Sequence, residues 1–337
     1  MAGGKETPRQ KMIGMMYLVL TALLALNISK EVLNGFVKVE RGLIQTQETL
    51  KSKSLNTFGE ISNRYDNNKE KVGPFFDAAL EVKTASEELR AYMQTLKATT
   101  MAASEGKLKL KTSGELESEP ETLEPYLGVD SKGAPMCIPL DFKRPEDQDK
   151  PLADQKNLIS KPDAYDAVTL LLYGTDIANP RDGAWSAVEL RKKLEAYRDG
   201  LKAITFVDAE GLSVDLPDGL KNSIDKRFEF KNEFENKEER TWEYVNFNHV
   251  PLAAVMPIMS KIIIDVQDAE QDVLSFLNSR IDGESFKVND FRPLLVPQSN
   301  YVLQGDTIRA KVMLAGFDKT NEPKMYVSTP PHNGDTI

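Results

Sequence analysis

One segment near the N-terminus constrains this chain more than any other: residues Met12–Ser29 carry no charged side chain. The segment has 18 residues and is flanked by Lys11 and Lys30. That length is close to the minimum needed to cross the roughly 30 Å hydrocarbon core of a bilayer. Two interpretations follow. The segment is either the apolar region of a secretory signal peptide behind a basic leader, or an uncleaved membrane anchor.

The start of the segment favours the anchor. Thr7 suits an N-cap, Pro8 the first helical position and Gln10 the third, which is the pattern of a capping box. A helix from Pro8 to Ile28 would be about 31 Å long, enough for a full span. We therefore predict a short N-terminus over residues 1–7 and a transmembrane helix over residues 8–29.

The residues after the segment also argue against cleavage. Ala25-Leu26-Asn27 ends in Asn, where a signal-peptide site needs a small residue. Apolar residues then continue at helical spacing past Lys30, so the helix is predicted to continue beyond the membrane; they are Val32, Leu33, Phe36, Val37, Leu43, Ile44 and Leu50. Two alternatives stay open: an exported periplasmic binding protein with a cleaved leader, and a membrane-anchored sensor, which usually needs a returning membrane helix and a cytoplasmic output domain.

The charge distribution predicts the orientation. Residues 1–11 contain three basic side chains and one acidic, whereas the whole chain has a net charge of −9. The positive-inside rule then places the N-terminus in the cytoplasm and everything after about Lys30 on the other side of the membrane. The acidic balance also argues against nucleic acid as a partner, because neutralising phosphates needs clustered Lys and Arg.

Composition and motifs disfavour most enzyme classes. The single cysteine, Cys137, excludes an internal disulfide framework, and two histidines leave little room for His-based metal or nucleophile chemistry. Phosphate-binding, dinucleotide-binding, zinc-protease, nucleophile-elbow and CxxC motifs are all missing from the sequence. We therefore predict a non-enzymatic protein without a cofactor or metal, in which Cys137 is either buried or a cross-link between two copies.

Five residues of the span are candidate functional positions. Arg9 lies in the first turn, where the helix dipole disfavours a cation; it either reaches the headgroups as a topology signal or meets a partner. Tyr17, about two turns further along, presents either an apolar ring or a hydroxyl that faces a partner. Gly14, Thr21 and Ala25 fall within about 40° on a helical wheel, which suits close helix contact but also arises by chance in an Ala- and Leu-rich run. Without Asp, Glu or His, the span has no proton carrier of its own.

The N-terminal residues resemble a known family. The matching strings are KETPRQKM at 5–12, MMYLV at 15–19 and ALNISKEV at 25–32. Together they resemble the GldM/PorM family, inner-membrane motor proteins of Bacteroidota gliding motility and type IX protein secretion. The resemblance is dense over residues 3–37. Over the remainder it extends only to the architecture, a helical periplasmic region followed by immunoglobulin-like modules.

The resemblance implies partners and a mechanism. It implies a homodimer whose paired membrane helices sit inside a ring of five GldL/PorL-like multi-span subunits, driven by proton flow. Arg9 and Tyr17 match the family's membrane arginine and tyrosine, and the arginine is expected to pair with a glutamate of the ring. Family members continue through further modules toward periplasmic and outer-membrane components, so we expect this chain to be part of a longer protein.

The rest of the sequence predicts a helical periplasmic domain over residues 30–284. Two long helices separated at Gly73-Pro74 come first, and a proline-rich insertion with loops and hairpins follows at 103–155. Met136-Cys137-Ile138 is predicted to be buried or in a hairpin. Three later helices are predicted at Ala164–Tyr173, Ala184–Ile204 and Val250–Ile281. Short strands over residues 285–337, at Phe291–Val296, Ile308–Leu314 and Met325–Ser328, predict the start of a β-sandwich of the immunoglobulin-like type.

Overall fold

The protein is described from a computed structural model. The described residues are 8–26, 30–118, 126–129, 133–137, 161–207, 213–235, 238–283, 290–297 and 310–317, with shorter pieces at 123, 141–142, 158–159, 301, 305, 307, 309, 326–327 and 335–336. Side chains of 22–26 and 30 are outside the description. The chain divides into two compact units, Met1–Ser275 and Phe276–Ile337.

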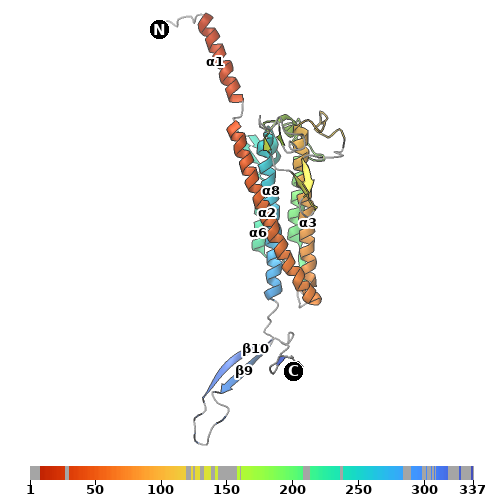
Figure 1. Cartoon of the computed structure of the whole chain (residues 1–337), viewed down its shortest axis with the longest axis vertical. Helices are drawn as coiled ribbons and strands as arrows, with labels where there is room; N and C mark the ends of the chain where they lie inside the picture. Colours follow the sequence, from red (N-terminus) through yellow and green to blue (C-terminus); the bar gives the residue numbers. More distant parts are fainter. Residues whose placement is uncertain are drawn as a thin grey trace. The chain divides into compact units, whose positions relative to one another are not determined.

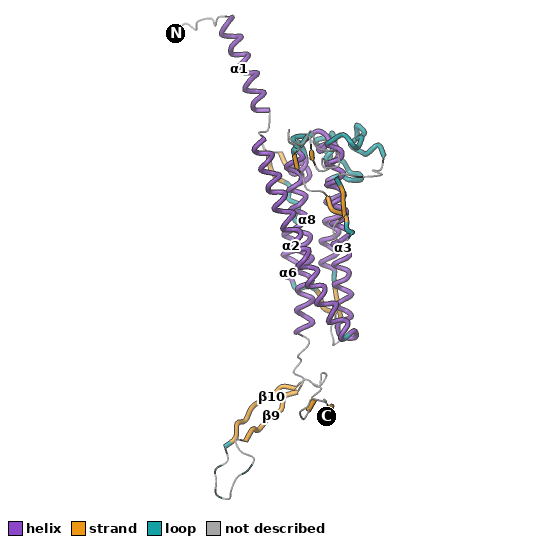
Figure 2. The backbone as a smooth tube through the Cα atoms, in the orientation of Figure 1, coloured by secondary structure: helices purple, strands orange, loops and turns teal. Residues whose placement is uncertain are grey.

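The first unit is mainly helical, as predicted. Long helices lie along one another in a bundle, with shorter helices packed against them (Figures 1 and 2). The helices are α1 (Pro8–Leu26), α2 (Lys30–Asn67), α3 (Lys69–Ser104), α4 (Asp166–Leu172), α5 (Ala187–Ala203), α6 (Asp218–Arg227), α7 (Trp242–Phe247) and α8 (Leu252–Gly283), the last of which continues into the second unit.

The break between the two long N-terminal helices is not where the sequence predicted it. α2 ends at Asn67 and α3 begins at Lys69, so Gly73 and Pro74 lie inside α3. Asn68 caps α3, because its side chain accepts a hydrogen bond of 3.1 Å from the backbone N–H of Lys71. Pro74 is the sixth residue of α3, so it removes the backbone hydrogen bond that an N–H there would donate to the Glu70 carbonyl, and the helix continues through it.

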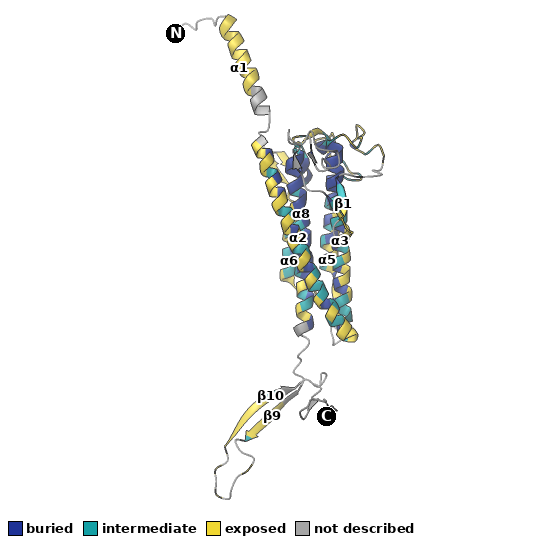
Figure 3. Cartoon of the chain, viewed as in Figure 1, coloured by how far each residue is buried: buried dark blue, intermediate teal, exposed yellow. Residues whose placement is uncertain are grey.

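α3 and α8 supply most of the bundle core. Buried apolar residues of α3 include Phe75, Met93 and Leu96, and the predicted apolar side of α8 is buried at Val255, Met259, Ile263, Val266 and Val273 (Figure 3). A buried hydroxyl pair links three helices: Ser86 of α3 and Tyr197 of α5 lie 2.7 Å apart, and Tyr197 Oη also donates to the Val266 carbonyl of α8 at 3.2 Å. The prediction of α8 as a core helix is confirmed.

The first unit also contains several short strand pairs. β1 (Leu127–Val129) and β2 (Pro135–Cys137) form an antiparallel hairpin that places Cys137 in a buried position, as the sequence predicted. Leu110 and Leu116 form an isolated antiparallel bridge within the insertion, where the sequence predicted loops and hairpins. The remaining pairs are the antiparallel β5 (Thr205–Val207) with β6 (Ser213–Asp215), the antiparallel β7 (Glu233–Glu235) with β8 (Glu238–Arg240), and the parallel β3 (Asp141–Phe142) with β4 (Leu158–Ile159). Residues 119–122, 124–125, 130–132, 138–140 and 143–155 of the predicted insertion lie outside the description.

The second unit contains two antiparallel strand pairs after the end of α8. β9 (Asp290–Pro297) pairs with β10 (Ala310–Phe317), and β11 (Tyr326–Val327) pairs with β12 (Asp335–Thr336). The sequence predicted strands at the positions of β9, β10 and β11. Neighbouring side chains of β9 and β10 are exposed on both faces of the ribbon, including Leu294, Leu295, Val312, Met313 and Leu314.

For the predicted transmembrane helix, the structure and the sequence-based prediction differ. α1 begins at Pro8, where the sequence placed the helix start, and its described backbone ends at Leu26. Within the described part of the chain, no helix is both long enough and apolar enough to cross a membrane.

Candidate functional site

The described side chains of α1 are exposed throughout (Figure 3). Arg9 is exposed in its first turn, and Tyr17 is 68% exposed. Large apolar side chains surround Tyr17 along the helix; they are Met12, Ile13, Met15, Met16, Leu18, Val19 and Leu20. A continuous apolar surface of this kind marks a site of contact with lipid or with another protein.

The three small residues of α1 have different surroundings. The Thr21 hydroxyl donates to the carbonyl of Tyr17 at 2.7 Å and lies 3.1 Å from the carbonyl of Leu18, so its polar group is satisfied within the helix and can face an apolar partner. A Cβ added at Gly14 would meet no atom within 4 Å. Ala25 lies on α1, but its side chain is outside the description. The roles assigned to Arg9, Gly14, Tyr17, Thr21 and Ala25 stay predictions.

A buried charged cluster inside the bundle was not predicted from the sequence. Lys97 Nζ of α3 donates to Glu40 Oε1 of α2 at 2.6 Å and to Ser260 Oγ of α8 at 2.6 Å. Ser260 Oγ in turn donates to Glu40 Oε1 at 2.9 Å. The side chains of Lys97 and Glu40 are only 3% and 1% exposed. Each of these buried charges stabilises the other, since removing one partner would leave an uncompensated charge in the interior and lower the stability of the fold.

More buried polar contacts follow along α2. Gln47 Nε2 donates to the Ser260 carbonyl at 3.0 Å, and Gln267 Nε2 donates to the Gln47 carbonyl at 3.2 Å. Further along, Ser54 Oγ donates to Glu270 Oε1. Burial raises the pKa of Glu270, an effect opposed by the nearby Arg90 and by the Ser54 hydrogen bond. One feature of the sequence could have indicated these buried polar contacts. Glu40, Gln47 and Ser54 are spaced seven residues apart, which places them on the same side of a helix as its apolar residues.

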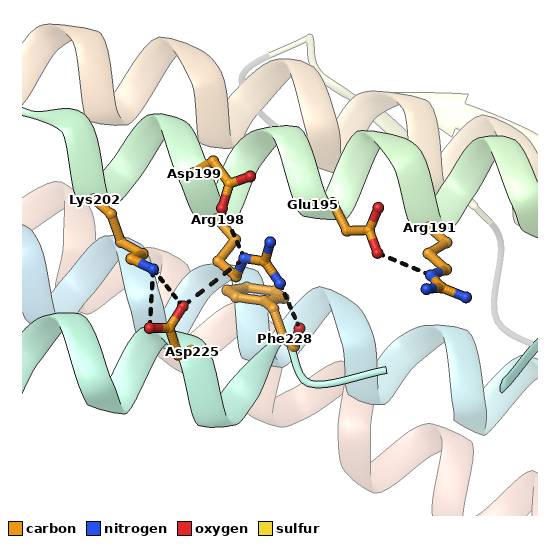
Figure 4. Close-up of polar contacts among 7 residues, drawn as sticks. All are labelled: Arg191, Glu195, Arg198, Asp199, Lys202, Asp225 and Phe228. Atoms are coloured by element: carbon orange, nitrogen blue, oxygen red, sulfur yellow. Dashed lines mark hydrogen bonds and ion pairs between the residues drawn. The ribbon is translucent and has the colours of Figure 1, made fainter. Parts of the chain in front are cut away.

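Another set of ion pairs lies between α5 and α6 (Figure 4). Lys202 Nζ of α5 contacts both carboxylate oxygens of Asp225 of α6, at 2.7 and 2.9 Å, and Arg198 Nε lies 3.9 Å from the same carboxylate. Arg198 also bridges to Asp199, at 2.9 Å, and to the Phe228 carbonyl, at 3.5 Å. These side chains are partly or largely exposed, so each pair contributes only about 0–1 kcal/mol. They hold α6 against α5 without forming a binding site.

The described surface offers little for small-molecule chemistry. A depression of about 470 Å³ is lined by α3 residues alone, which makes it part of an open helix face; the lining residues are Asp77, Leu80, Glu81, Thr84, Ala85 and Glu88. Among the described residues, no group of three or more His, Cys, Asp or Glu side chains could hold a metal ion.

Cys137 is predicted to be chemically inert in the folded protein. Its Sγ is buried 3.4 Å from Met101 Sδ, and burial raises the pKa of the thiol to about 12. The reactive species is the thiolate, which is scarce far below that pKa. A chromogenic disulfide reagent at about pH 8 should therefore leave the native protein unmodified and titrate one thiol after denaturation. Rapid labelling of the native protein would contradict this assignment.

Comparison with known protein families agrees with the resemblance seen at the N-terminus. A family model of the GldM N-terminal domain matches residues 31–127 and 146–280, which is more than half of the chain. A second model, of the GldM second domain, matches residues 282–335. A comparison with curated proteins gives no significant match. Since the two family models follow each other across residues 31–335 in the order of their names, the chain belongs to the GldM family.

Proposed function

We propose that this protein is a non-enzymatic component of an inner-membrane motor that is driven by the proton motive force and powers type IX protein secretion and gliding motility. Membership of the GldM family supports this assignment. In the proposed arrangement, residues 8–29 span the membrane, residues 30–284 form a periplasmic stalk domain, and residues 285–337 begin a β-sandwich module.

The observation that carries the membrane assignment is the uniform exposure of apolar side chains on α1. Residues Met12–Leu20 include seven large apolar side chains that are at least half exposed. Exposed apolar area costs about 25 cal/mol per Å² in water, so burying this surface against lipid or another protein would be favourable. The uncharged run Met12–Ser29, the basic residues before it and the predicted cap at Thr7 favour lipid and partner membrane helices as the environment that buries it.

Arg9 and Tyr17 are the residues proposed to couple proton flow to motion. The span supplies a fixed cation and no group that releases a proton at neutral pH, so the proton carrier must come from a partner. In our proposal, a glutamate of a GldL/PorL-like ring pairs with Arg9 when it is charged and leaves when it is protonated. Repeated pairing and release would step a ring of five subunits around two copies of α1. Gly14, Thr21 and Ala25 would let the two copies approach closely.

α2 is proposed to carry the motion outward. It starts four residues after the end of α1 and continues for 38 residues, a length of about 57 Å. With this length and its buried contacts to α3 and α8, α2 would act as a stiff element of the proposed periplasmic domain.

Native mass spectrometry of the complex released in mild detergent tests this function. We expect five ring subunits with two copies of this chain, and we expect each copy to retain residues 1–27. Loss of those residues would indicate a cleaved leader and favour an exported binding protein instead. Recovery of this chain without ring subunits under conditions that preserve other membrane complexes would contradict the proposed assembly.

A further inference from the structure

The buried face of α2 has an unusual composition. Between Val37 and Ile61, the buried side chains are Glu40, Gln47 and Ser54, and all three are polar. Apolar neighbours in this stretch, such as Ile44 and Phe58, are only half-buried. Seven residues correspond to about two helical turns, so the three polar residues lie in one row along the helix.

Each member of this row has a specific partner on another helix. Glu40 bonds to Lys97 of α3 and Ser260 of α8, at 2.6 and 2.9 Å. The side-chain amide of Gln47 donates to the backbone carbonyl of Ser260, and the backbone carbonyl of Gln47 accepts from Gln267 Nε2. Ser54 donates to Glu270. We call these contacts of Glu40, Gln47 and Ser54 the polar ladder.

We propose that the polar ladder is a register clamp, which fixes the axial position of α2 on α3 and α8 so that a displacement of α2 moves the bundle without slippage. The functional part of this inference rests on the proposed transmission of motion from the membrane. The structural part, a single register enforced by buried polar contacts, stands independently of it.

The physical argument is the difference between apolar and polar contacts. Apolar packing is non-directional, and between Val37 and Ile61 the apolar side chains of α2 are at most half-buried, so their contacts alone would let this stretch shift along its neighbours at modest cost. Hydrogen bonds need donor–acceptor distances near 3 Å, so a shift of one residue, about 1.5 Å, already disrupts them.

A shift by a whole seven-residue repeat is also excluded. It would bring Gln47 to the position of Glu40 and leave the buried Lys97 ammonium without a carboxylate. Buried polar residues are best known in helix packing for setting register in this way.

The test replaces the charged rung of the ladder by apolar residues in the full chain. A Glu40→Leu/Lys97→Met double variant should fold with a Tm equal to or above that of the wild type, because buried ion pairs are often replaceable by apolar residues of similar volume. Register is read by pulsed electron paramagnetic resonance between spin labels on Thr46→Cys and Lys261→Cys, both exposed positions, in a Cys137→Ala background.

The expected result separates stability from register. The parent should give one narrow distance distribution, and the double variant a broadened distribution or a second population displaced by about 5 Å or more, a full helical turn. Ile61→Ala, which removes buried apolar contacts of the same helix, is the matched control: it should lower the Tm and keep the narrow distribution. A narrow, unshifted distribution in the double variant would overturn the register clamp.

Two further measurements complete the test. Should the double variant not fold, Glu40→Met/Lys97→Leu replaces the same charged rung with other apolar side chains and is judged by the same distance measurement, where an unshifted narrow distribution again overturns the inference. Secretion and gliding by cells carrying the double variant address the motor separately. Wild-type activity together with a broadened distribution would leave the register clamp intact and contradict the proposed transmission through α2.

Discussion

Replacing Arg9 by alanine is expected to abolish type IX secretion and gliding while the chain still folds and inserts into the membrane. In the proposed span, Arg9 is a fixed cation, and residues 8–29 contain no Asp, Glu or His. Truncating one partner of a buried charge pair costs about 2–5 kcal/mol or more, which would uncouple protonation of the partner glutamate from movement. Secretion of a reporter substrate and gliding speed measure the effect, and chain abundance in the membrane fraction establishes that the variant is present.

Two matched variants sharpen this result. Lys11→Ala removes the other basic side chain near the start of α1 and should leave secretion intact, because a topology signal depends on the sum of basic residues and not on one of them. Arg9→Lys keeps the charge but loses the planar fork that binds a carboxylate in two places, so we expect partial activity. Normal secretion by Arg9→Ala would show that this residue acts only as a topology signal.

Replacing Lys97 by methionine should destabilise the helical domain by about 3–5 kcal/mol, since it leaves Glu40 as an uncompensated buried charge. The Glu40 side chain is 1% exposed. Of the contacts described above, the substitution would leave Glu40 only the hydrogen bond from the Ser260 hydroxyl. Thermal or urea unfolding followed by circular dichroism measures the loss.

Lys192→Met is the matched control for this prediction. Lys192 pairs with Asp182 at 2.6 Å, but both side chains are about 60% exposed (59% and 63%). Exposed pairs contribute about 0–1 kcal/mol, so the control should unfold almost as the wild type does. An equally small effect of Lys97→Met would mean that water or a rearrangement stabilises the Glu40 carboxylate in the bundle.

The sequence carried enough information for the family, the helical class and most long elements. Residues 5–32 contain a dense family pattern, and the family was confirmed by matches that begin at residue 31. The apolar spacing of Val255, Met259 and Val266 placed α8 correctly, because a long helix with one apolar face gives a strong periodic signal. Cys137 was expected to be buried or in a hairpin and is both.

Short elements gave too little signal. α6 has ten residues and buries only Ile224, so its apolar periodicity is weak; its start at Asp218, after Pro217, was the available marker. α7 has six residues and depends on Thr241, whose side chain accepts from the Tyr244 N–H. The break at Asn68 was missed because Gly73-Pro74 is a stronger breaker by composition, whereas the cap depends on one side-chain hydrogen bond.

The buried ion pair was missed for a different reason. A Glu and a Lys that are 57 residues apart give no local sign that they will meet, and polar residues on long helices normally face water. Their burial follows from how α2, α3 and α8 pack together, which periodicity alone does not specify.

The connectivity of this bundle also determines when it can form. The partners of Gln47 and Ser54 on α8 lie 213 to 220 positions later in the chain, so the first long helices cannot complete their contacts until almost the whole domain has been synthesised. Such non-local closure slows folding and exposes unfinished surfaces to aggregation. During this delay, α2 presents Glu40, Gln47 and Ser54 to water along a row that would otherwise be apolar. We expect these polar residues to make the early helical hairpin less prone to aggregation than an apolar row would, until α8 has been synthesised.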